Sequence, residues 1–180
     1  MDFTGGNRKG RARQYVDAMA SSLQSLVRFG PVAAGRRNIA ESYVANRLLH
    51  REFVRRLDEV VSLGLLAEME AGAMPADAQR EKLLVDLAQL HASLLETSAR
   101  MLSEQLRSWE SFVEAGFSPP YGAYEELTRT GGVLAHVEAG LVRSTHNLPP
   151  ATATSLALAR QSVATLMAQA PRLQVWERAA

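Results

Sequence analysis

Apolar residues recur with a helical period over most of the stretch from Pro31 to Gly116. On a wheel of about 100° per residue, the apolar side chains of residues 44–66 gather on roughly half the circumference, and those of residues 83–113 do the same. This spacing predicts two amphipathic helices and not strands. Gly72 and Pro75 interrupt the pattern, and since glycine often closes a helix and proline often opens one, the two helices are expected to form a hairpin. Gly35 could shorten the first arm.

Three shorter segments also have helical spacing. Apolar residues line one face of residues 15–29 and of residues 151–170, and a further helix is expected over residues 121–143, where Gly131-Gly132 leaves its continuity open. The sequence therefore predicts an all-α protein, an antiparallel helical bundle of about five helices built on the long hairpin. We expect a flexible basic arm over residues 1–13, a single bundle domain over residues 14–170 and a C-terminal tail over residues 171–180.

The composition narrows the classes of protein to consider. There is no cysteine in the 180 residues, which excludes disulfides, thiolate metal sites and cysteine nucleophiles. No apolar run approaches the length of about 18 residues that a membrane span needs, and the polar amino terminus lacks the apolar core of a signal peptide. The expected location is the cytoplasm, or a particle assembled there.

Charge changes this picture because it is unevenly distributed. Residues 1–56 hold eleven Arg and Lys against four Asp and Glu, a net charge of +7, which leaves −6 for the rest of a chain whose total is +1. Such a split indicates an anionic partner or head-to-tail packing between copies. If the partner is a nucleic acid, arginine forks on phosphate would supply the contacts. The residues expected to bind it are Arg8, Lys9, Arg11, Arg13, Arg36 and Arg37.

Two of the four histidines, His50 and His91, fall on the apolar faces of the two arms and are expected to face the interior, whereas His136 and His146 are expected to be exposed. With the turn near residues 73 and 74, positions whose numbers add up to about 147 lie level, which separates His50 from His91 by about 9 Å along the axis. His50 would then bond Thr97 or Ser98. Whether both histidines line a ligand pocket or only fix the register of the core is left open.

No metal or cofactor site is expected, because neither interior histidine has a carboxylate or a second histidine three or four residues away. No nucleophile, base and acid set can be picked out either, so we expect a protein that is not an enzyme. The leading hypothesis is a structural or assembly protein that forms homo-oligomers through its helix faces and binds an anionic polymer, for which nucleic acid is the leading candidate. The alternatives are an amphipathic protein of a granule or membrane surface, and a ligand- or metal-binding sensor that uses the core histidines.

Overall fold

The computed structural model describes residues 3–28 and 38–118, together with eleven single positions between residues 122 and 168. Of these described residues 89% are helical and none is in a strand, which confirms the all-α class. The expected helices over residues 121–143 and 151–170 lie largely outside the described residues, as do the tail and Arg36 and Arg37. Among the helices that are described, none combines the length and the apolar character needed to cross a membrane.

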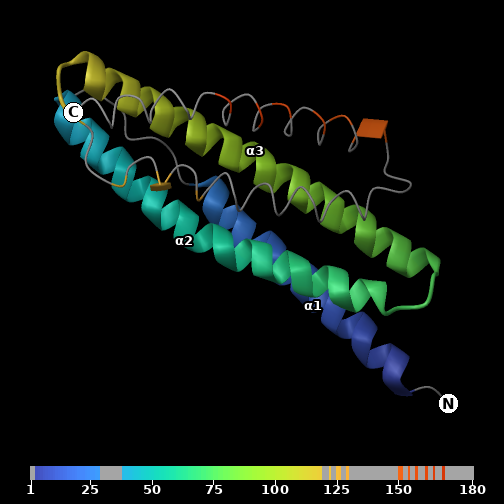
Figure 1. The fold of residues 1–180 in the computed structure, drawn as a ribbon. Helices are drawn as coiled ribbons and strands as arrows, with labels where there is room; N and C mark the ends of the chain where they lie inside the picture. The colour runs from blue at the N-terminus through green and yellow to red at the C-terminus, as the bar shows by residue number, and fades with distance from the viewer. Residues whose placement is uncertain are drawn as a thin grey trace.

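The predicted hairpin is present, formed by α2 (Ile39–Gly72) and α3 (Ala78–Glu114) (Figure 1). Each arm begins at a polar cap. The side chain of Asn38 accepts a hydrogen bond from the Glu41 amide at 2.8 Å, and that of Asp77 accepts one from the Arg80 amide at 2.9 Å. Because such caps satisfy amides that have no partner within the helix, they set where each arm starts. The first arm thus begins after Gly35 and not at Pro31.

The amino-terminal helix is longer than expected. α1 runs from Phe3 to Val27, so most of residues 1–13 forms the beginning of a helix and not a flexible arm. Ala12 is fully buried and Val16 is 4% exposed, because this part of α1 packs against the hairpin. Tertiary contacts therefore outweigh the low helix propensity of the glycines in this segment. In Figure 1 the amino-terminal end of α1 lies near the turn of the hairpin, and the helix runs back along α2.

All three helices contribute to one hydrophobic core. Its fully buried centre includes Met19 and Leu26 of α1, Phe53 and Leu57 of α2, and Leu94 of α3.

At the open end of the hairpin, aromatic rings join the arms. Tyr43 stacks on Phe112 with ring centroids 4.2 Å apart, Phe112 stacks on Phe117 at 4.8 Å, and Trp109 nearby in sequence is completely buried. Large aromatic side chains bury more area than any others, so this cluster fixes the end of the hairpin that lacks a covalent turn.

The register between the arms differs from the prediction. Asn46 donates a hydrogen bond to Ser108 at 3.3 Å, and His91 lies directly against Gly64. In both pairs the residue numbers add up to 154 or 155, not 147. One reason is that the turn occupies residues 73–77 and is centred later than expected; the remainder is a stagger of about one helical turn. His50 is therefore not level with Ser98, whose hydroxyl has no hydrogen-bond partner among the described residues.

Candidate nucleic-acid interface

Three of the residues expected to contact nucleic acid form ion pairs with acidic groups of the same chain. The Lys9 ammonium lies 3.1 Å from the Asp77 carboxylate, the Arg11 guanidinium 3.2 Å from that of Glu70, and the Arg13 guanidinium 2.9 Å from that of Asp86. These carboxylates belong to the end of α2, the turn and the start of α3. The basic half of α1 is therefore held against the acidic, closed end of the hairpin.

Asp77 has two roles in this contact. The Arg80 amide and then the Lys9 ammonium lower the pKa of its carboxyl group. The same side chain caps α3, so one carboxylate both starts a helix and anchors α1.

Of the other predicted residues, Arg8 is exposed and makes no ion pair with any described residue. The side chains of Lys9, Arg11 and Arg13 remain between 33% and 52% exposed. Exposed ion pairs of this kind contribute about 0–1 kcal/mol each, so they can exchange one anion for another. The structure thus brings Lys9, Arg11 and Arg13 onto one helix, but beside carboxylates that repel phosphate.

A second set of arginines lies on α2. Arg47 and Arg51 both donate to the carboxylate of Glu126, Arg47 through Nε and Nη2 at 2.9 Å each. Partial burial acts to raise the pKa of Glu126, but the hydrogen bonds from the two arginines outweigh it and the pKa is lowered. These bonds attach Glu126 to the first half of α2.

The next residue, Glu52, accepts hydrogen bonds from Arg55 and then Arg56, and these lower its pKa to about 2. The sequence analysis did not find the Glu126 contact. The only signal available was the recurrence of Arg47, Arg51 and Arg55 at intervals of four residues, which places them along one side of a helix.

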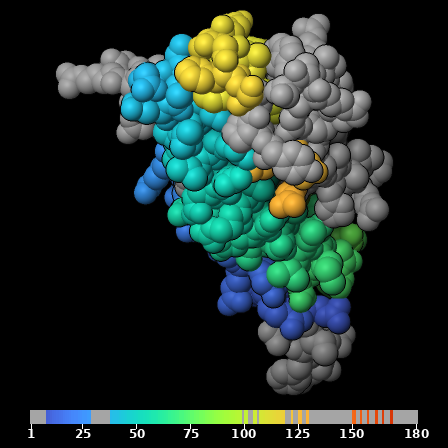
Figure 2. Space-filling view, turned by 60° about the vertical axis from the view of Figure 1, so that its left-hand side comes forward, coloured from blue at the N-terminus to red at the C-terminus, as the bar shows by residue number. Residues whose placement is uncertain are grey.

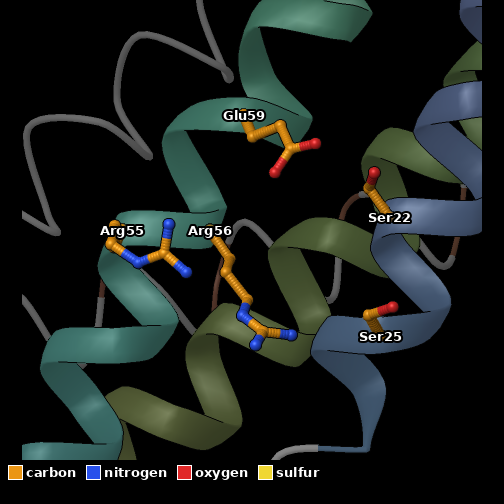
Figure 3. A pocket seen from close by; sticks show the side chains of 5 residues that line it. All are labelled: Ser22, Ser25, Arg55, Arg56 and Glu59. Atoms are coloured by element: carbon orange, nitrogen blue, oxygen red, sulfur yellow. The ribbon is translucent and has the colours of Figure 1, made fainter.

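A small polar pocket lies between α1 and α2 beside these arginines (Figure 3). Its volume is about 210 Å³, and it is lined by Ser22, Ser25, Arg55, Arg56 and Glu59. In Figure 3 the two serines project from α1 and the charged residues from α2. Two guanidinium groups and two hydroxyls are donors that suit phosphate or sulfate, but Glu59 in the lining and Glu52 on both arginines offset their charge. The pocket alone therefore has little net charge with which to attract an anion.

Both interior histidines are buried, as predicted: His50 is 1% and His91 5% exposed. Burial lowers the pKa of each to about 4, and for His50 the nearby Glu126 opposes this shift. His91 Nδ1 has no hydrogen-bond partner among the described residues and lies 3.9 Å from the Glu68 carboxylate. With His91 against Gly64, the two histidines are fourteen residues apart along α2, or about 21 Å. They cannot bind one metal ion together, and no group of metal-ligating side chains is found among the described residues.

No protein family, curated protein or solved structure matches this chain. Function must therefore be argued from the chemistry of the helices themselves.

Proposed function

We propose that this protein is a non-enzymatic structural protein that self-associates through its helix faces. Its arginine-rich amino-terminal third binds an anionic polymer, for which nucleic acid is the leading candidate. Several ion pairs among the described residues join segments that are far apart in the sequence. Lys9–Asp77, Arg11–Glu70 and Arg47–Glu126 all have this form. Such pairs suit a scaffold, whereas catalysis needs titratable groups that converge on a space where a substrate can bind.

The observation that carries the proposal is the large apolar side chains that α2 exposes to solvent. Val44 and Leu48 near its start are 54% and 59% exposed, and Leu65, Leu66 and Met69 near its end are 38%, 39% and 71% exposed. The solvent face of a helix is normally polar, and groups of exposed apolar side chains mark sites of association. Self-association would remove this surface from water.

The uneven charge of the sequence supports the proposed binding of an anionic polymer, but the acidic residues paired with α1 oppose that binding. Glu70 and Asp86 hold Arg11 and Arg13 in place and would repel a phosphate chain. Removing these two negative charges should therefore strengthen polyanion binding if α1 forms the interface. Asp77 is unsuitable for this test because it also caps α3.

The test is fluorescence anisotropy with labelled single- and double-stranded oligonucleotides. We expect the chain to bind, to lose affinity steeply between about 50 mM and about 200 mM salt, and to bind more tightly as the double variant Glu70→Gln/Asp86→Asn. Glu104→Gln, which alters a partly exposed acidic residue paired only locally with Arg107, is the matched control and should have a much smaller effect. No binding by either form at the lower salt concentration would refute the nucleic-acid half of the proposal.

Self-association is tested separately, by light scattering over a range of protein concentration. A chain that remains monomeric throughout would refute the assembly half. The exposed apolar residues of α2 also favour one alternative, adsorption to a hydrophobic granule or membrane surface. That alternative predicts a monomer that binds neutral lipid vesicles with little dependence on salt.

A further inference from the structure

Eight exposed residues of α2 form one continuous stripe along the helix. Starting at Val44 and ending at Met69, exposed positions follow one another at alternating intervals of four and three residues, the spacing of a single helix face. We call this face the outer stripe; its eight positions are Val44, Leu48, Arg51, Arg55, Asp58, Ser62, Leu65 and Met69. Figure 2 shows α2, coloured cyan to green, running across the front of the molecule.

The chemistry of the outer stripe is nearly the same read in either direction. It has apolar residues at both ends and polar residues in the middle. If the stripes of two copies are laid against each other in opposite directions, the numbers of the two residues that face each other add up to 113. The resulting pairs are Val44 with Met69, Leu48 with Leu65, Arg51 with Ser62, and Arg55 with Asp58. A two-fold axis between Arg55 and Asp58 therefore brings apolar side chains onto apolar ones and opposite charges together, as an interface between two identical copies requires.

At the centre of the stripe, the ion pairs already present leave Arg55 and Asp58 able to make this contact. The Asp58 carboxylate makes no ion pair with any residue in the described part of the chain. Arg55 is 68% exposed, and it bonds Glu52 through Nε and Nη2, which leaves Nη1 able to donate to a second carboxylate. In a parallel pair of stripes Arg55 would instead face Arg55, and Asp58 would face Asp58. Like charges in contact oppose association, so the charges select the antiparallel direction.

We propose that two copies of this chain pair through the outer stripes of α2, antiparallel, around a two-fold axis between Arg55 and Asp58. This proposal rests on the self-association proposed above and specifies its surface, its partner and its direction. The stripe spans 26 residues, about 39 Å of helix. A single helix face of this length makes a small interface, so the dimer should form and dissociate with protein concentration.

The first experiment uses disulfide trapping, for which the absence of native cysteine leaves no background. In the variant Leu48→Cys/Leu65→Cys, position 48 of each copy faces position 65 of the other. Within one chain the two positions are about 26 Å apart along α2, far beyond the Cα separation of about 4.4–6.8 Å that a disulfide spans. Mild oxidation should therefore produce a covalent dimer on a non-reducing gel.

The two single-cysteine variants are the controls. Each places its cysteine opposite leucine in the antiparallel pair, so neither should form the dimer in comparable yield. If the single variants cross-link as well as the double variant, or if the double variant does not cross-link at all, the antiparallel arrangement is wrong.

The second experiment measures the dimerisation constant by analytical ultracentrifugation. Arg55→Asp sets aspartate against Asp58 at two symmetry-related contacts, so it should weaken the dimer by about tenfold or more, and Asp58→Arg should do the same. The double variant Arg55→Asp/Asp58→Arg restores both pairs and should recover most of the affinity. Both sites are on an exposed face, so circular dichroism should show unchanged helix content for all three variants.

The outcomes separate this proposal from the one on which it rests. If the chain associates but neither the cysteine nor the charge variants behave as described, the outer stripe is not the interface, while self-association stands. If the chain is monomeric at every concentration, both proposals are refuted. If Leu48→Glu abolishes binding to vesicles and leaves the oligomeric state unchanged, the stripe binds a hydrophobic surface and not a second copy.

Discussion

Replacing Gly64 by alanine tests how closely the three helices meet. Gly64 lies in α2 where α1 and α3 both approach it. An added Cβ would lie 2.8 Å from His91 Nε2 of α3, 3.3 Å from Met19 Sδ and 3.4 Å from Met19 Cε of α1. The first distance is shorter than a non-bonded carbon and nitrogen can share, so His91, which is 5% exposed, would have to move within a packed core.

The size of the effect follows from two opposing contributions. Alanine in place of glycine within a helix stabilises it by about 0.5–1 kcal/mol. Forcing an extra carbon into a packed core costs about 1–3 kcal/mol. Gly10 of α1 provides the matched control, since it is also helical but has nothing within 4 Å of an added Cβ. Gly10→Ala should raise the free energy of unfolding by the helix contribution alone. The free energy of unfolding of Gly64→Ala should be about 1–3 kcal/mol lower than that of Gly10→Ala.

The assay is urea denaturation followed by circular dichroism, on both variants and on His91→Ala with and without Gly64→Ala. His91→Ala removes the ring that the added methyl group would meet, so Gly64→Ala should lower the free energy of unfolding less in that background. The coupling energy between the two substitutions then measures the steric contribution directly. If Gly64→Ala is as stabilising as Gly10→Ala, the close approach of α2 and α3 at this position is wrong. The register inferred from it would then be wrong as well.

Three further predictions concern buried and capping groups, and each is checked by urea denaturation. Because burial lowers the pKa of His50 and His91 to about 4, the unfolded chain binds more protons below about pH 6.5. Stability should therefore fall from there to about pH 4 by up to about 3 kcal/mol per histidine and then level off. A flat profile over this range would contradict the burial of both rings. Ser98→Ala should raise stability by about 1 kcal/mol, because its hydroxyl is fully buried without a described partner; a loss would reveal a hydrogen bond. Arg100→Ala should cost about 0.5–1 kcal/mol, because its guanidinium donates to the Val27 carbonyl at the end of α1 at 3.0 Å, and an unchanged stability would show that water replaces it.

The fold was predictable from the sequence where the signal is periodic. The hairpin, its break near Gly72 and Pro75, and the burial of His50 and His91 all follow from apolar residues at helical spacing, and the structure confirms them. The start of α1 could not be predicted in this way. Its first turns are held by ion pairs to residues some 60 to 70 positions away and by burial of Ala12, neither of which leaves a periodic pattern in residues 3–13.

The register shows a second limit of the same kind. Counting from the turn assumes that the two arms are level at the point where the chain reverses. The break at residues 73–77 and the close fit of His91 against Gly64 instead shift the arms by about two helical turns from the predicted register. Of the two partners predicted for His50, Thr97 and Ser98, the shift excludes Ser98, whose hydroxyl has no partner among the described residues. The corrected register also moves the two histidines further apart than predicted, to about 21 Å along α2.

The charges that are separated along the sequence form ion pairs within the chain, so an anionic partner must compete with these pairs. Counted along the sequence, the positive first third and the negative remainder suggest two molecules; in the structure, Lys9, Arg11 and Arg13 bring them together within one. A polyanion that binds these residues must displace carboxylates that remain a few ångströms away. Each exposed pair is weak enough to exchange, but the displaced carboxylates continue to repel phosphate unless α1 moves away from them. Burial of Ala12 and Val16 opposes that movement, so the docking of α1 and the binding of nucleic acid through this helix are in competition. Neutralising Glu70 and Asp86 relieves the repulsion without touching the buried contacts, which is why that variant should bind more tightly if the interface lies on α1.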